Sequence, residues 1–269
     1  MKHNRIGVFD SGIGGLTVLR ELLALIPGAD MIYFGDTARV PYGTKSSKTV
    51  IHYTLRCANF LVSKGIDMLI VACNTASAHA IPALKARLDI PIIGVIESGS
   101  LAAIDAGGSK IGVIGTMSTI KSEVYEKTIH ALSPDTEIIA RACPLFVPLV
   151  EEGWFDDEVT EIVARRYLSD LATYGIDTLL LGCTHYPLLK GVISKIMGGN
   201  VKIVDSAKAT ASMVAEMICP PLAEGPEREA NRAREIIFYL SDLTQRFIDT
   251  GQLFLGHEMT HIYEVDLEI

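Results

Sequence analysis

The chain has 269 residues, of which 49% are hydrophobic, 21% are charged and 7% are aromatic, and its formal net charge is −8. This hydrophobic content excludes an intrinsically disordered chain, while 23 glycines and 5 cysteines are too few for a collagen or a disulfide-rich scaffold. The acidic balance provides no electrostatic footprint for nucleic acid or anionic lipid. At about 150 residues per domain, the length fits one large or two modest globular domains.

The five cysteines, at positions 57, 73, 143, 183 and 219, include no C-x-x-C pair. Their odd number and their spacing indicate neither a disulfide framework nor a zinc knuckle. The first apolar run, Ile6–Phe9, is too short for a signal peptide, and no run reaches the roughly 18 apolar residues of a transmembrane helix. We therefore expect a cytoplasmic protein in a reducing compartment.

Short runs rich in Ile, Val and Leu alternate with longer segments of helical period, a pattern typical of buried parallel strands joined by crossover helices. The predicted strands are Ile6–Phe9, Met31–Phe34, Met68–Val71, Ile92–Val95, Ile111–Ile114, Glu137–Ala140, Thr178–Leu181 and Val201–Val204. The predicted helices are Leu16–Leu25, Ser46–Lys64, Ala76–Leu88, Lys121–Leu132, Asp157–Tyr174 and Leu188–Met197. The predicted fold class is α/β.

The C-terminal tail has an organisation of its own. Pro220–Arg234 is polar and rich in charges, which predicts a linker or the exposed start of a helix. After it, Ile236–Leu240 predicts a strand and Leu243–Asp249 a helix, and the last residues predict an edge strand or a disordered end. Nothing in the tail indicates chemistry.

The sequence contains an internal repeat. Residues 65–75, GIDMLIVACNT, recur 110 residues later as 175–185, GIDTLLLGCTH, so that Cys73 corresponds to Cys183. Weaker matches relate two further pairs of segments, 5–11 with 110–116 and 95–98 with 203–206.

The repeat predicts two related α/β halves, roughly 5–98 and 110–206, followed by the tail. Ligands of open α/β sheets bind beyond the carboxyl ends of the strands. Two such ends facing each other would therefore enclose one cleft, to which each half would present its cysteine.

Each of the two matching cysteines follows a predicted strand and precedes a predicted helix. A lone cysteine is more often a small buried hydrophobe, but a helix N-terminus lowers the pKa of a thiol below its free value of about 8.5. Residues able to bind a carboxylate or an amine follow both cysteines, namely Asn74 and Thr75, and Thr184 and His185. The duplication favours a functional interpretation for this pair. Three cysteines lack that setting and are interpreted as structural: Cys57, Cys143 and Cys219.

The segment Asp10–Gly15, DSGIGG, lies between a predicted strand and a predicted helix, where glycines let a ligand approach the backbone. It is not a dinucleotide fingerprint, because Thr17 takes the place of the third glycine. A structural turn and a carboxylate or phosphate site are equal alternatives here. Gly43–Ser46, GTKS, lacks the Gly-Lys pair of a P-loop, and we discount it.

His185 is the only one of seven histidines placed at a predicted strand end, which favours proton transfer over a structural role. Glu151 and Glu152 close an apolar segment, Cys143–Val150, which we expect to be a loop. An acidic pair of this kind is more often a solvated face. The sequence does not decide which of the two faces the cleft.

Seven ordered motifs resemble the glutamate racemases, of the cofactor-independent aspartate/glutamate racemase superfamily. They are FDSGIGGLTVLREL at 9–22, YFGDTARVPYG at 33–43, VACNTASA at 71–78, IGVIESG at 93–99, CPLFVPLVEEG at 143–153, LLGCTHYPLL at 180–189 and VDSA at 204–207. The tail ending in Phe254-Leu255-Gly256 is also similar to the end of these proteins. No departure falls on a position expected to carry chemistry.

The resemblance implies two similar α/β domains with mainly parallel sheets flanked by helices, related by a pseudo-twofold axis, with the active site in the interdomain cleft. It implies a first domain of 1–98 with 208–269 and a second of 99–207. The implied activity interconverts L- and D-glutamate without a cofactor or a metal, and supplies D-glutamate for bacterial peptidoglycan. The implied partner is this small-molecule substrate, with neither nucleic acid nor a membrane, and a homodimer is left open.

Inversion at Cα requires two groups on opposite faces of the carbon, one starting as a thiolate and one as a thiol. By position these are Cys73 and Cys183. The resemblance implies that Asp10 assists Cys73, and that His185 with Glu151 assists Cys183. The implied substrate-binding residues are Asp10, Ser11, Tyr42, Gly43, Asn74, Thr75, Thr116, Thr184 and His185.

Two other interpretations stay open. The chain could act on aspartate or another acid as a racemase or a decarboxylase of the same superfamily, although the presence of both cysteines argues against a decarboxylase. From a different class, it could be a non-catalytic amino-acid-binding protein or a thiol redox protein.

Overall fold

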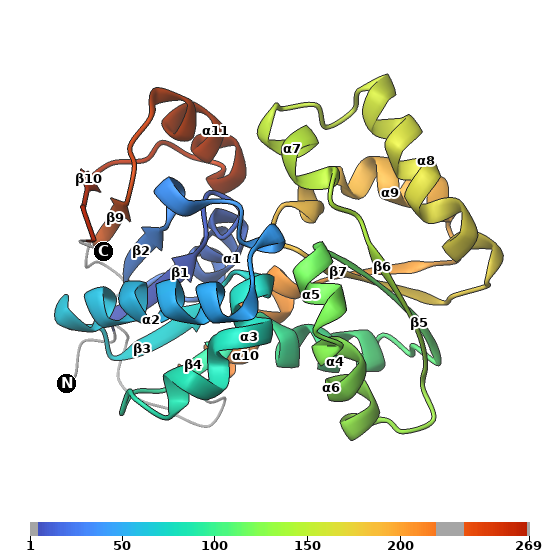
Figure 1. The fold of residues 1–269 in the computed structure, drawn as a ribbon, viewed down its shortest axis with the longest axis horizontal. Helices are drawn as coiled ribbons and strands as arrows, with labels where there is room; N and C mark the ends of the chain where they lie inside the picture. The colour runs from blue at the N-terminus through green and yellow to red at the C-terminus, as the bar shows by residue number, and fades with distance from the viewer. Residues whose placement is uncertain (1–4, 219–233, 268–269) are drawn as a thin grey trace.

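The computed structural model describes residues 5–218 and 234–267. Figure 1 shows two sheets, one in each half of the molecule, with helices packed around both. The first sheet has the strand order β10-β9-β2-β1-β3-β4 and the second the order β6-β5-β7-β8. Every strand pair is parallel. These features confirm the predicted α/β class with two mainly parallel sheets.

The strands of the first sheet are β1 Arg5–Asp10, β2 Asp30–Gly35, β3 Met68–Val71, β4 Ile92–Gly94, β9 Ile236–Leu240 and β10 Ile262–Glu264. Those of the second are β5 Lys110–Gly115, β6 Glu137–Ala142, β7 Thr178–Gly182 and β8 Lys202–Asp205. The order β2-β1-β3-β4 recurs as β6-β5-β7-β8, so the repeat read from the sequence is a repeat of topology.

Eleven α-helices lie in the described residues: α1 Leu16–Leu25, α2 Ser47–Ser63, α3 Asn74–Lys85, α4 Val95–Asp105, α5 Met117–Lys121, α6 Val124–Leu132, α7 Phe146–Glu151, α8 Glu158–Thr173, α9 Lys190–Met197, α10 Ser206–Ile218 and α11 Gln245–Leu255. Three short 3-10 helices cover Thr37–Arg39, Tyr42–Thr44 and Tyr186–Leu189. No helix of the described segments is long and apolar enough to cross a membrane.

The expectation of a loop over Cys143–Val150 was wrong, because α7 occupies Phe146–Glu151. Its buried residues, Phe146, Leu149 and Val150, follow helical spacing over a single turn and a half. That stretch is too short for periodicity to be recognised in the sequence. Pro148 lies in the first turn, where its missing N–H breaks no helical hydrogen bond.

Several helix boundaries also differ from the prediction. The helix expected over Ala76–Leu88 is α3, which begins at Asn74 because Cys73 caps it. The helix expected over Lys121–Leu132 is α6, which begins at Val124, while Lys121 is the last residue of the preceding helix α5. The strand expected over Ile92–Val95 ends at Gly94, and α4 begins at the next residue, Val95. α4 and α10 have no counterpart among the predicted elements.

The tail extends the first sheet. β9 pairs with β2 and β10 with β9, so the predicted strand at Ile236–Leu240 is confirmed and an edge strand follows it. The predicted helix at Leu243–Asp249 is α11, which starts two residues later and continues to Leu255. Within the expected linker, residues 220–233 lie outside the described residues. The sheet membership of the tail agrees with a first domain completed by C-terminal residues, whose boundaries stay a prediction.

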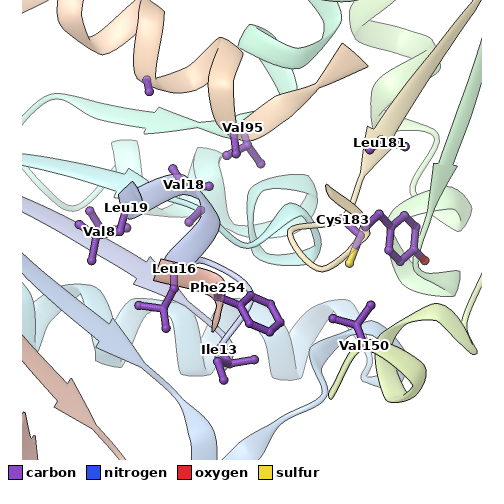
Figure 2. Close-up of a cluster of buried hydrophobic side chains, with 14 of the residues drawn as sticks. Val8, Ile13, Leu16, Val18, Leu19, Val95, Val150, Leu181, Cys183 and Phe254 are labelled. Atoms are coloured by element: carbon purple, nitrogen blue, oxygen red, sulfur yellow. The ribbon is translucent and has the colours of Figure 1, made fainter. Parts of the chain in front are cut away.

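One buried apolar cluster joins the two halves. Figure 2 shows Val8 and Leu16 of the first half, Leu181 and Cys183 of the second, and Phe254 of the tail within this cluster. All five side chains are at most 5% exposed. The cluster therefore fixes the end of β7 against α1 and α11, which brings the cysteine of the second half to the boundary between the halves.

Candidate active site

A cavity of about 280 Å³ lies where the residues that follow β3 and β7 meet. Its volume is just below the usual range of small-molecule sites, about 300–1,000 Å³. Both Cys73 and Cys183 line it, and each is 5% exposed. Of the residues expected at the site, all except Asp10 line this cavity: Ser11, Tyr42, Gly43, Cys73, Asn74, Thr75, Thr116, Glu151, Cys183, Thr184 and His185.

Cys73 is the N-cap of α3. Its Sγ accepts a hydrogen bond from the main-chain N–H of Ala76 at 3.5 Å and donates to Ser11 Oγ at 3.3 Å. Burial raises the pKa of the Cys73 thiol to about 12, and the negative charge of Asp10 acts in the same direction. The N–H of Ala76 at the start of α3 does lower this pKa, as the sequence argument expected, but desolvation outweighs the hydrogen bonds to the sulfur. Cys73 is a neutral thiol at neutral pH.

Asp10 ends β1 and is fully buried, behind the cavity wall rather than on it. Its Oδ2 accepts a hydrogen bond from the N–H of Gly12 at 2.9 Å, whereas Oδ1 has no hydrogen-bond partner among the described residues. Burial raises the pKa of Asp10. A carboxyl group whose charge opposes the Cys73 thiolate is therefore present next to that sulfur.

His185 connects Cys183 to Glu151. Its Nδ1 lies 3.9 Å from Cys183 Sγ, and its Nε2 lies 3.1 Å from Glu151 Oε1 on α7. Burial lowers the pKa of His185, but its hydrogen bonds and charge interactions with Cys183 and Glu151 outweigh burial and raise that pKa to about 10. Phe254 packs edge-on against the imidazole at 5.6 Å. At neutral pH, a cation therefore faces the Cys183 sulfur.

The two acidic residues of this segment have different surroundings. Glu151 lines the cavity and binds His185, whereas Glu152 forms an ion pair with Arg246 of α11 at 2.7 Å. Arg246 also donates a hydrogen bond to the main-chain oxygen of Glu151 at 3.1 Å. The question that the sequence left open is answered in favour of Glu151, because α7 turns one carboxylate inward and the next one toward the surface.

The hydroxyl group of Tyr42 is already bound within the protein. It donates to Asp36 Oδ2 at 2.6 Å, and the other oxygen of Asp36 accepts hydrogen bonds from Arg39 and Ser241. Asp36 is fully buried and was not expected at the site. Tyr42 and its neighbour Gly43 are therefore available to a ligand through the main chain and the ring rather than through the phenol.

Threonines from both halves form a triangle of hydroxyl groups. Thr75 Oγ1 lies 3.0 Å from Thr116 Oγ1 and 3.2 Å from Thr119 Oγ1, and the two last atoms are 3.0 Å apart. Thr116 also caps α5 by accepting a hydrogen bond from the N–H of Thr119. Sequence reasoning missed Thr119, because no helix was predicted to begin after Thr116.

The glycine-rich segment after β1 mainly allows close packing of the two halves. A Cβ on Gly14 would collide with Thr184 Oγ1 and would lie 2.6 Å from His185 Nδ1. Thr17 Oγ1 donates to the main-chain oxygen of Thr184 at 3.1 Å. Of the two alternatives for this segment, Gly14 supports the structural one, while Ser11 of the same segment lines the cavity. Within 5–218 and 234–267, no cluster of His, Cys, Asp and Glu side chains could hold a metal ion.

Each α/β half places a cysteine at the equivalent strand end, and both cysteines line one small cavity. A histidine–glutamate pair lies beside one of the two sulfurs. This arrangement brings two thiol groups and a histidine to one cavity, which is the chemistry that proton transfer requires. A family model described as Asp/Glu/Hydantoin racemase matches residues 6–214, and the chain belongs to this family. It is thus a racemase-type isomerase.

Individual relatives cover the whole chain. It is 52% identical to the glutamate racemase of Geobacter metallireducens over 270 residues, which covers 100% of this chain and 98% of that protein. It is 58% identical to the glutamate racemase of Persephonella marina over 263 residues, or 97% of each chain. The crystal structure of Francisella tularensis glutamate racemase in complex with D-glutamate matches with a TM-score of 0.91 at 38% identity and covers 100% of this chain and 99% of that one.

Proposed function

We propose that the protein interconverts L- and D-glutamate by exchanging a proton at Cα through Cys73 and Cys183. The observation that carries this proposal is the position of the two sulfurs, each at the end of the equivalent strand and both on one cavity. The choice of glutamate is supported by the full-length similarity to glutamate racemases and by the D-glutamate in the similar Francisella tularensis structure.

The two sulfurs have different neighbours. Cys73 is the thiol, because burial and Asp10 oppose its ionisation. Cys183 lies next to His185, whose Nδ1 is 3.9 Å from its Sγ, so a proton acceptor or donor is available beside this sulfur. One sulfur removes the Cα proton from its side, the other returns a proton from the opposite side, and their roles are exchanged in the reverse direction.

The cavity itself must stabilise the carbanion that forms when the Cα proton leaves. In the absence of an electron-sink cofactor, stabilisation falls to fixed dipoles in an enclosed site. The proposed binding residues are neutral donors: Ser11, Asn74, Thr75, Thr116 and Thr184 through their side chains, and Tyr42 and Gly43 through the main chain. Neutral donors bind the substrate carboxylates without the excess ground-state affinity that would raise no rate.

The cellular role belongs to the same proposal. We assign the protein to the supply of D-glutamate for peptidoglycan in the bacterial cytoplasm, acting without a cofactor and without nucleic acid or membrane partners. A homodimer is compatible with this assignment and is tested by the mass of the protein in solution.

The test is a substrate panel. Pure L-glutamate, L-aspartate and L-glutamine are incubated separately with the protein, and the enantiomers are separated by chiral chromatography. We expect L-glutamate alone to approach equal amounts of both enantiomers, and Cys73→Ala and Cys183→Ala to form no D-glutamate. Faster racemisation of aspartate would reassign the substrate. Tight binding of glutamate without any racemisation would favour an amino-acid-binding protein.

A further inference from the structure

A tyrosine of the second half holds a cavity residue of the first half. Tyr125 lies in the first turn of α6, and its hydroxyl group donates a hydrogen bond to Asn74 Oδ1 at 2.5 Å across 51 positions of sequence. Both side chains are buried, with Tyr125 1% and Asn74 2% exposed. Burial also raises the pKa of the Tyr125 phenol well above its usual range, so the phenol keeps its proton and remains a donor.

The length of this hydrogen bond identifies which end of the Asn74 amide faces the tyrosine. A distance of 2.5 Å is within the range of O–H···O hydrogen bonds and too short for an N–H···O contact, which starts near 2.7 Å. The carbonyl oxygen of Asn74 therefore faces Tyr125. Its amide nitrogen, Nδ2, is buried and has no hydrogen-bond partner among the described residues.

An unpaired buried N–H group costs free energy unless a ligand accepts its hydrogen bond. Asn74 lines the cavity, so a ligand there is the available acceptor. We propose that Tyr125 is a positioning residue that turns the amide of Asn74 so that its NH₂ group donates to a carboxylate oxygen of the substrate. This proposal rests on the racemase function proposed above and adds to it the group that fixes a donor at this point of the cavity.

Two glycines leave space for the Tyr125 side chain. The Tyr125 ring passes over Gly182, the residue before Cys183, where a Cβ would lie only 2.9 Å from Cε2 of the ring. The equivalent position of the first half is Ala72, so the repeat departs from itself at this point. Gly99 also lies beneath the phenol, because a Cβ there would be 3.6 Å from the hydroxyl oxygen. The ring thus reaches the other half through a gap between two glycines.

Without the phenol, the Asn74 amide has no fixed orientation. A flipped amide would present Oδ1 to the cavity and repel a carboxylate, which also accepts hydrogen bonds. The amide is not a proton donor or acceptor in the reaction at Cα, so its loss affects binding of both enantiomers. We therefore expect Tyr125→Phe to raise KM for L- and D-glutamate about tenfold, equivalent to one hydrogen bond, with a smaller change in kcat.

The experiment is a double-mutant cycle with Tyr125→Phe, Asn74→Ala and the combined variant, measured as KM in both directions and as the Kd of D-glutamate by calorimetry. Because Tyr125 acts through Asn74, the Tyr125→Phe effect should disappear in the Asn74→Ala background. Tyr167→Phe is the matched control, since the Tyr167 hydroxyl accepts from the main chain of Leu145 outside the cavity. An equal effect of Tyr125→Phe with and without Asn74 would overturn the proposal.

A second readout keeps this test separate from the activity. In protein labelled with ¹⁵N at asparagine side chains, we expect one sharp pair of Asn74 NH₂ signals in the wild type. In Tyr125→Phe we expect shifted signals that are broadened or doubled by amide flipping. Identical spectra would contradict the positioning role, whether or not the protein turns over glutamate. A wild type that keeps the sharp signals but racemises nothing would instead refute the proposed function.

Discussion

Cys73 and Cys183 occupy the same place in two repeated units. Each follows a strand that pairs with the central strand of its sheet, β3 with β1 and β7 with β5, and both sulfurs line one cavity. Their surroundings nevertheless differ, since Ser11 and Asp10 lie near the first sulfur and His185 near the second. The repeat places a thiol group at the same position of each half, and the residues around the two sulfurs are different.

Glu151 and Glu152 provide a test of the interaction between His185 and Glu151. Glu151→Gln removes the carboxylate that holds His185, so we expect kcat to fall about 100-fold, within the usual range for acid–base groups. Glu152→Gln breaks only the exposed ion pair with Arg246 and should leave kcat within about twofold, as expected for exposed pairs. Steady-state kinetics in both directions decides the matter. Equal losses in the two variants would contradict the assignment of Glu151.

Gly14 tests the packing of the first half against Thr184 and His185. Gly14→Ala would push these two residues out of position, and we expect an activity loss of about 100-fold, typical of a displacement of about 1 Å near reacting groups. Gly28→Ala is the control, because a Cβ there meets no atom within 4 Å. Full activity of Gly14→Ala would show that the close approach is not required.

Asp36 tests the anchoring of the segment that carries Tyr42. Asp36→Ala leaves Arg39 and the Tyr42 hydroxyl without their buried partner, and we expect a loss of about 3 kcal/mol in the free energy of unfolding. Glu123→Gln, which removes an exposed ion pair with Lys127, should cost less than about 1 kcal/mol. Urea unfolding followed by circular dichroism measures both. Similar losses would mean that the Asp36 network adds little.

The raised pKa of His185 predicts how the free energy of unfolding depends on pH. Its pKa is about 10 in the folded protein against a usual value of 6.5, so the folded state binds its proton more tightly. The resulting stabilisation is complete below pH 6.5 and is lost as the pH rises through about 10. The raised pKa of Cys73 acts in the same direction above pH 9.0.

We therefore expect the free energy of unfolding to decrease between pH 6.5 and 10, and to decrease less in His185→Gln. Urea titrations at several pH values measure this difference. The exposed His257, replaced by Gln, should leave the decrease unchanged. A decrease as steep in His185→Gln as in the wild type would assign it to other groups.

The sequence was sufficient for the strands, for the repeat and for the residues that follow each repeated strand. Buried parallel strands are continuous apolar runs, and both cysteines follow such a run. The strands and the residues after them could therefore be predicted from the local sequence. The contacts of Asp36 with Ser241 and of Tyr125 with Asn74 could not be predicted, because they join segments 205 and 51 positions apart. No local pattern indicates which distant side chain completes a hydrogen bond.

The raised pKa of Cys73 could not be predicted for a related reason. The sequence indicated the helix that follows Cys73 but not how completely the sulfur is buried between Ser11 and α3. Burial depends on the whole fold, and here it outweighs the local effect of the helix. The short helix α7 escaped prediction because it spans only six residues.

The most direct test of the two-cysteine proposal is racemisation of L-glutamate in deuterium oxide, followed by proton NMR and chiral separation during the first turnovers. We expect the D-glutamate formed to carry deuterium at Cα while the remaining L-glutamate keeps its protium, because the two faces exchange protons with different sulfurs. D-glutamate that retained the original protium would contradict two separate bases and would require a single group serving both faces.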